Sequence, residues 1–140
     1  MTDISTSRSC PDIGLSDVKS RSAMEENGWI FHLSHSDMVL HGDRCGNNGW
    51  FGFYSGSSVG SISAYFKGPG TARLIFGNCW IDNEVAVYLN HKKISLAYGN
   101  ETNKETYFNF ISGDTLRIVE DGAIIKLHSL TISCDGKLKL

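Results

Sequence analysis

The chain has 140 residues, which is enough for one domain with a hydrophobic core. Hydrophobic residues make up 41% and charged residues 20%, which excludes wholesale disorder, and the net charge of −2 offers no basic surface for nucleic acid. No apolar run approaches the roughly 18–20 residues that cross a bilayer, so we expect no transmembrane segment.

The first 27 residues are polar and contain no continuous apolar run of the kind that signal peptides carry. We therefore separate a polar N-terminal segment, residues 1–27, from a folded domain, residues 28–136, and a C-terminal tail, residues 137–140. No signal peptide is visible, so the compartment has to be inferred from other features.

Short alternating runs, broken by glycine and asparagine, fill the chain from Gly28 onward. Residues 29–33 predict a first strand, with residues 38–40 as its partner. The stretch 41–60 holds six glycines, which permit tight turns, so we expect a structured loop with aromatic residues set into it. Further strands are expected around residues 61–66, 72–76, 85–89, 106–110, 116–118 and 123–134. About eight strands without helical periodicity predict an all-β fold.

The last of these strands contains an irregularity. Ile125 and Leu127 have one parity, whereas Leu130 and Ile132 have the other. Because side chains alternate between the faces of a sheet, both sets reach the core only if one extra residue is inserted, so we predict a β-bulge at His128–Ser129. The same parity argument predicts a core that contains Leu74, Phe76, Val85, Val87, Leu89, Phe108, Phe110, Leu116, Ile118, Leu130 and Ile132.

Four cysteines, Cys10, Cys45, Cys79 and Cys134, are separated by 35, 34 and 55 positions. Zinc modules place their ligands in close pairs, so this spacing argues against a structural zinc site. An even number of distant cysteines favours disulfide bonds, and hence an oxidising compartment, over four buried thiols. Cys134 has the inward parity of the last strand. A bond from it to Cys10 would leave Cys45 and Cys79 as a second pair, although the sequence leaves all three connectivities open.

Three segments carry a resemblance to a known family. Val85–Asn90 is a strand that leads into a short turn, Ile111–Ile118 is a turn that leads into a strand, and Leu127–Ile132 closes the domain. Over about residues 61–134 the chain resembles the galactose-binding-like jelly-roll β-sandwich of discoidin-type domains and many carbohydrate-binding modules. The resemblance implies a jelly roll of about eight antiparallel strands. Such domains bind sugars or lipid headgroups, or form non-catalytic parts of larger enzymes.

The resemblance also bears on cofactors. Relatives often carry an acidic residue, which helps to hold a structural calcium ion, where this chain has His128. We therefore expect no cofactor, with calcium as the one ion that the resemblance leaves open.

Two kinds of pattern bear on catalysis. Gly56–Gly60 matches G-x-S-x-G, but that motif needs a buried strand before the serine and a helix after it, and here another strand pattern follows. Glycoside hydrolysis needs two carboxylates at a defined separation, and the available pairs, Asp82 with Glu84 and Glu120 with Asp121, have the setting of loops and turns. We therefore expect no enzyme activity and keep a small hydrolase as the third hypothesis.

His32, His35 and His41, interleaved with Asp37 and Asp43, are side chains that can bind metals. His32 and His35 have opposite parity on a strand and would face apart. Partly exposed histidines on a polar surface are the better interpretation, so we assign no metal ligands.

Two stretches suit sugar recognition, which needs a flat aromatic face together with fixed amide, carboxylate and guanidinium groups. Residues 41–54 and 78–83 combine such side chains with a glycine-rich or turn-like backbone. We expect these loops to converge as a ligand-binding site made of Asp43, Arg44, Asn47, Asn48, Trp50, Tyr54, Asn78, Trp80 and Asp82. For the two tryptophans the alternative is a place in the core, because tryptophan is usually well buried.

The predicted function is that of a non-catalytic, lectin-like carbohydrate-binding module whose partner is a glycan or a cell-surface carbohydrate. The N-glycosylation sequon Asn100-Glu101-Thr102 and the cysteines favour an extracellular or secreted protein. The second hypothesis is a structural or protein-interaction β-sandwich of an extracellular or capsid assembly, without a small ligand. Exposed aromatic side chains in a concavity would favour the first hypothesis, and buried tryptophans under a flat polar surface the second.

Overall fold

The computed structural model describes residues 21–32, 51–53 and 59–133. Predictions that fall on the rest of the chain lie outside the described residues. These include the strand at 38–40, the histidines His35 and His41, and the G-x-S-x-G motif at 56–60, of which only the last two residues are described.

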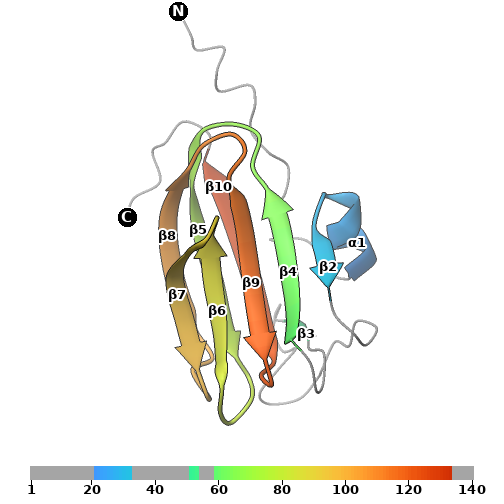
Figure 1. Cartoon of the computed structure of the whole chain (residues 1–140), viewed down its shortest axis with the longest axis vertical. Coiled ribbons are helices and arrows are strands. Elements are labelled where there is room, and N and C mark those ends of the chain that lie inside the picture. Colours follow the sequence, from blue (N-terminus) through green and yellow to red (C-terminus); the bar gives the residue numbers. More distant parts are fainter. Residues whose placement is uncertain (1–20, 33–50, 54–58, 134–140) are drawn as a thin grey trace, which may run out of the picture.

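Two antiparallel sheets pack face to face (Figure 1). One has the order β3 (Phe51–Phe53), β10 (Ile125–Ser133), β5 (Gly70–Asn78) and β8 (Lys104–Phe110). The other has the order β2 (Ile30–His32), β4 (Val59–Tyr65), β9 (Thr115–Asp121), β6 (Glu84–Leu89) and β7 (Lys92–Tyr98). From β7 to β10 the chain changes sheet at every connection. The predicted all-β jelly-roll sandwich is thus confirmed.

The core lies between the sheets and consists of the side chains that have inward parity. Of the predicted core residues, Leu74, Phe76, Val85, Val87, Phe108, Phe110, Leu116, Ile118 and Leu130 are buried, while Leu89 and Ile132 are partly buried against them. Phe66 stacks on Phe110 with ring centroids 3.9 Å apart, and it meets Phe108 edge to face at 6.0 Å. The parity argument therefore gave the correct inward face of each of these strands.

The predicted β-bulge in the last strand is confirmed. The pairing of β10 with β5 shifts register between Leu127 and Ser129, so His128 is the extra residue. Leu127 before the bulge and Leu130 after it are both buried, at 1% and 0% exposure. The inserted residue thus lets side chains of opposite parity, before and after the bulge, point into the same core.

A short helix, α1 (Arg21–Glu26), precedes β2 and was not expected from the sequence. It ends at Glu26 and is followed by a turn at Gly28, whose φ of 98° is a left-handed conformation that glycine adopts without strain. Met24 and Trp29 are both 2% exposed and belong to the core. The helix lies within residues 1–27, and it packs on the same core as the sandwich. No helix in the described ranges is long and apolar enough to cross a membrane.

Strand β7 was also missed by the sequence analysis, because its burial follows no clear alternation. It forms one edge of the five-stranded sheet and pairs with β6 alone. Its register shifts between Val87 and Tyr88 of β6, where Ile94 of β7 is the extra residue. Lys92 and Lys93 at its start are exposed, and the Lys93 Nζ lies 2.9 Å from a carboxylate oxygen of Glu84.

Candidate functional site

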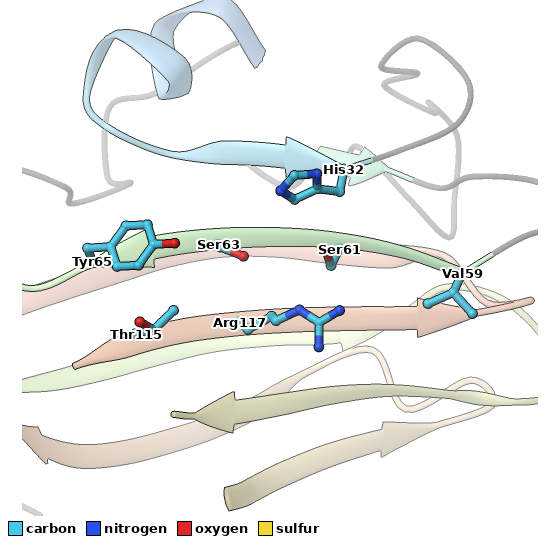
Figure 2. Close-up of a pocket in the computed structure, with 7 residues that line it drawn as sticks. All are labelled: His32, Val59, Ser61, Ser63, Tyr65, Thr115 and Arg117. Atoms are coloured by element: carbon cyan, nitrogen blue, oxygen red, sulfur yellow. The ribbon is translucent and has the colours of Figure 1, made fainter. Parts of the chain in front are cut away.

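The outer face of the five-stranded sheet carries a hollow over its first three strands. On β4, Ile62 and Ala64 point into the core, which turns the alternate residues toward the outer face. The hollow has a volume of about 560 Å³ and is lined by His32, Val59, Ser61, Ser63, Tyr65, Thr115 and Arg117 (Figure 2). We call this set of seven residues the sheet hollow.

The register of the strands explains why the surface is concave here. Ser61 and Ser63 of β4 are flanked on one side by His32 and Ile30 of β2. On the other side Ser63 pairs with Arg117 of β9. Two small side chains at the centre, with longer ones around them, leave a depression whose floor is formed by serine. Both serines are buried, at 3% and 6% exposure, although they face away from the core.

Three exposed side chains, Tyr65, Arg117 and His32, give the sheet hollow its chemical character. Tyr65 is 55% exposed, and in Figure 2 its ring lies at one end of the hollow with its hydroxyl group directed toward Ser63. The guanidinium of Arg117 and the imidazole of His32 lie on opposite sides of Ser61 in the same view. The site therefore combines an aromatic face with directional donors and hydroxyl groups that both donate and accept.

None of the described residues that line the sheet hollow carries a carboxylate. Among the described residues, Arg117 makes no ion pair, and it is exposed. Arginine stays charged at all ordinary pH values. The hollow is therefore locally positive on a chain whose net charge is −2.

A second candidate surface lies at one end of the sandwich, where three loops meet. These are residues 79–83, 99–103 and 122–124, at the bottom of Figure 1, and we call them the loop end. Asn78 is the last residue of β5 and is 0% exposed. Its side chain and backbone form hydrogen bonds with residues of all three loops. Its Oδ1 accepts hydrogen bonds from the backbone N–H groups of Trp80 at 2.8 Å and Ile124 at 3.4 Å. Its Nδ2 donates to the carbonyl oxygens of Asn83 at 3.1 Å and of Asp82 at 3.4 Å.

The backbone of the loop end is held by further contacts. Asn83 has a φ of 64°, and its Nδ2 donates to the carbonyl oxygen of Gly122 at 3.1 Å. The N–H of Asn100 donates to the carbonyl oxygen of Trp80 at 2.8 Å. Asparagine tolerates the left-handed conformation because its side chain can bind the nearby backbone. These contacts give the three loops one defined arrangement.

The structure divides the predicted loop-site residues into two groups. Asn78 lies inside the loop end and positions its backbone, whereas Trp80 and Asp82 are on the surface. Trp80 is 41% exposed, which rules out the core position that the sequence left open for it. Ile81 and Tyr98, at 55% and 56% exposure, are exposed apolar side chains of the same end. The other predicted residues, Asp43, Arg44, Asn47, Asn48, Trp50 and Tyr54, lie outside the described residues.

Cys79 lies in the first loop of the loop end and is disulfide-bonded. It is the one cysteine within the described ranges, so Cys10, Cys45 and Cys134, and with them the connectivity, lie outside them. Cys79 is 3% exposed, and its N–H donates to the carbonyl oxygen of Ile124 at 3.3 Å.

One member of each carboxylate pair considered for catalysis, Glu84 and Glu120, has a structural role. Glu84 binds Lys93, and an Oε1 oxygen of Glu120 accepts hydrogen bonds from the N–H groups of Gly122 at 3.1 Å and Ala123 at 3.2 Å. Glu120 thus stabilises the turn between β9 and β10. Within the described ranges, no group of three or more His, Cys, Asp or Glu side chains has the arrangement of a metal site.

The sheet hollow was missed by the sequence analysis, apart from His32, which was weighed only as a metal ligand. A weak signal was present: Ser61, Ser63 and Tyr65 share a parity opposite to the apolar residues of β4, and so do Thr115 and Arg117 on β9. The sequence does not show which strands pair or in which register, and it is this pairing that places these residues side by side.

Comparison with known proteins gives similar structures but no assigned family. No family model matches the chain, and no curated protein matches it. A family 35 carbohydrate-binding module from an environmental isolate is 13% identical, with a TM-score of 0.49, over 86% of this chain and 91% of that one. A family 29 carbohydrate-binding module from Piromyces equi is 12% identical, with a TM-score of 0.44, over 79% of this chain and 95% of that one.

The secreted serine protease VesC from Vibrio cholerae is 13% identical, with a TM-score of 0.49 over 62% of this chain, and the match spans only 22% of the protease. Carbohydrate-binding modules of families 36 and 6 also occur among the similar structures. The jelly-roll sandwich of this chain is established by its own strand order.

Proposed function

We propose that the chain is a non-catalytic carbohydrate-binding module that binds a glycan in the sheet hollow. The observation that carries the proposal is the hollow itself. An exposed tyrosine ring shares one concave surface with a histidine, three hydroxyl-bearing side chains and an arginine that has no ion-pair partner among the described residues. An exposed aromatic side chain in a concavity is the feature that favours a sugar site over a ligand-free structural role.

Sugar chemistry matches this combination of side chains. One face of a pyranose ring is lined by C–H groups, which pack on an aromatic ring such as that of Tyr65. The edges of the ring carry hydroxyl groups that both donate and accept hydrogen bonds. Arg117 supplies fixed donors, and Ser61 and Ser63 supply hydroxyl groups that rotate to either role. A preformed surface of this kind binds without a large ordering cost.

The shape of the hollow suits a chain of sugars. Its long axis follows β4, which has 7 residues from Val59 to Tyr65. At roughly 3.4 Å per residue this run measures about 20 Å. The site is open along the sheet, so a longer polysaccharide can pass over it without an end having to enter.

Two features support an extracellular location. Cys79 is disulfide-bonded, and disulfides persist mainly in oxidising compartments. Asn100, the acceptor of the predicted N-glycosylation sequon, is exposed at a turn with a φ of 65°. We infer from these features that the module acts outside the cell or in a secretory compartment.

The loop end is the second candidate for the sugar site, and the exposure of Trp80 is the observation that favours it. In this version Trp80 stacks on the sugar and Asp82 binds a hydroxyl group, together with the predicted residues Asp43, Arg44, Asn47, Asn48, Trp50 and Tyr54. The rigid backbone around Asn78 would hold such a site in place.

The test is a glycan array with the purified chain, followed by calorimetric titration of a glycan that binds. Tyr65→Ala should weaken binding by about ten-fold or more, because the stacking surface is lost. Tyr107→Ala is the matched control, since Tyr107 is an exposed tyrosine on β8 of the other sheet, at 37% exposure. Its affinity should stay within about two-fold of wild type.

Trp80→Ala separates the two candidate sites in the same titration. If the affinity falls with Trp80→Ala and not with Tyr65→Ala, the sugar binds at the loop end. A wild-type chain that binds no glycan on the array contradicts carbohydrate binding altogether and favours the structural or interaction domain.

A further inference from the structure

The described lining of the sheet hollow contains a positive charge and no negative charge. A neutral sugar would leave this positive charge without a counter-charge. Arg117 is its permanently charged residue, and none of the seven lining residues is acidic. Binding a neutral ligand needs hydrogen-bond donors and acceptors in similar numbers, and amides would supply both. The hollow instead places a cation and an imidazole around a floor of serines.

The neighbours of Arg117 in the sheet do not neutralise it. In the ladder it pairs with Ser63 on one side and Tyr88 on the other, and both are uncharged. Asp121 lies four residues along β9, which is about 14 Å away at roughly 3.4 Å per residue. Glu84, an acidic residue of the adjacent strand, is bound to Lys93.

Arg73, on the other sheet, is an arginine whose charge is balanced by a carboxylate. Arg73 on β5 is hydrogen-bonded to Glu105 of β8, and that contact raises the pKa of the guanidinium. Both arginines lie on the outer face of a sheet, and both are flanked by a strand that carries an exposed tyrosine. Only Arg73 has a carboxylate partner among the described residues.

We propose that the glycan bound in the sheet hollow is acidic, with a carboxylate or sulfate group held by Arg117. This inference rests on the proposed function and specifies its ligand. The guanidinium presents paired N–H donors that match two oxygens of such a group. His32, across Ser61 from Arg117, offers a ring N–H to the same anion or to a neighbouring hydroxyl (Figure 2). Tyr65 then stacks on a sugar farther along β4.

The experiment compares acidic and neutral polysaccharides by calorimetric titration. Polygalacturonate supplies carboxylates, dextran sulfate supplies sulfate esters, and galactan and dextran are their neutral counterparts. The wild-type chain should bind at least one acidic polymer about ten-fold or more tightly than its neutral counterpart, and added salt should weaken that binding. The polymer that binds identifies which anionic group the hollow takes.

Arg117→Gln and Arg73→Gln are the matched variants, since each removes one positive charge from an outer sheet face. Arg117→Gln should lower the affinity for the acidic polymer by about ten-fold or more, while Arg73→Gln should stay within about two-fold of wild type. Equal losses in the two variants would mean that diffuse charge attracts the polymer, and would overturn the proposal. Denaturant unfolding curves of the two variants are measured alongside, and both should show a cooperative transition like that of wild type.

The failures of the two proposals are distinguishable. If the wild-type chain binds neutral and acidic glycans equally and Arg117→Gln changes neither, the ligand is not acidic but the module still binds carbohydrate. If the wild-type chain binds no polysaccharide of either kind, the proposed function itself is wrong.

Discussion

The sheet hollow and the loop end are two candidate binding surfaces of the same sandwich, and they are built differently. In the hollow, regular strands carry the side chains, and the concavity comes from two serines between longer neighbours. At the loop end, irregular backbone carries the exposed residues, and one buried amide, Asn78, holds it in place. The hollow carries the positive charge of Arg117, whereas Trp80, Ile81 and Tyr98 expose apolar surface at the loop end.

This difference separates residues whose side chains would contact a ligand from residues whose side chains hold the backbone in place. A side chain of the hollow can be replaced without disturbing the backbone, because the ladder of hydrogen bonds does not depend on it. The loop end has no such independence, since its backbone groups are bound by a side chain. Substitutions in the hollow should therefore change affinity, and substitution of Asn78 should change stability.

The largest effect is expected from Asn78→Ala. The change leaves the N–H groups of Trp80 and Ile124 without their partner, and a buried unpaired group costs about 1–3 kcal/mol. We expect a loss of about 2–5 kcal/mol in the free energy of unfolding, measured by denaturant titration.

Asn109→Ala is the control for this change, because Asn109 is an exposed asparagine on β8 and should cost no more than about 0.5 kcal/mol. A loss below about 1 kcal/mol in Asn78→Ala would show that the loop end is held by other contacts.

A smaller free-energy change, confined to binding, is expected from Ser63→Phe. The phenyl ring would fill the floor of the sheet hollow and should lower glycan affinity by about ten-fold or more. Ser63 is buried but faces the hollow and not the core, so the unfolding free energy should change by less than about 1 kcal/mol. Thr131→Phe makes the same kind of change on a central strand of the other sheet and should leave affinity unaltered. Undiminished affinity in Ser63→Phe would exclude the hollow as the binding site.

The smallest effect concerns the neutralised arginine of the other sheet. The hydrogen bond from Arg73 lowers the pKa of Glu105 below its ordinary value of 4.5. A lowered folded-state pKa means that the carboxylate stabilises the fold above about pH 4.5 and that this contribution is lost as the pH falls through the folded-state pKa. Since the pair is exposed, the contribution is small.

Glu105→Gln should therefore lower the unfolding midpoint slightly at neutral pH, and the difference from wild type should vanish in acid. Measuring both midpoints between neutral pH and pH 2 checks this. A difference that persists below the pKa of Glu105 would show that the effect does not come from its charge.

Local sequence patterns were sufficient for the strands and much of the core. The parity switch between Leu127 and Leu130 predicted the bulge, because a period of two admits no other way to bury both. Strand β7 was missed because an edge strand of mixed burial shows no alternation. Helix α1 is too short for a period of 3.6 residues to be visible in the sequence.

The sites were harder to predict because they depend on contacts between distant residues. Asn78 has the residue type of a sugar ligand, and nothing local shows that its amide would be enclosed by segments up to 46 positions away. Likewise, Ser63 and Arg117 become neighbours only through the pairing of β4 with β9. Exposure of Trp80 was one of two outcomes that the sequence allowed, and only the packing decided between them.

The edge strand β7 bears on whether copies of the protein aggregate at high local concentration. Free edges of sheets tend to add strands from other chains, which leads to aggregation. Here the edge opens with Lys92 and Lys93, and the extra residue Ile94 interrupts its pairing ladder. A strand from a second copy that joined this edge would lie against these exposed lysines and would have to match an interrupted ladder. Many copies could therefore be concentrated on one surface without their sheets fusing into fibres.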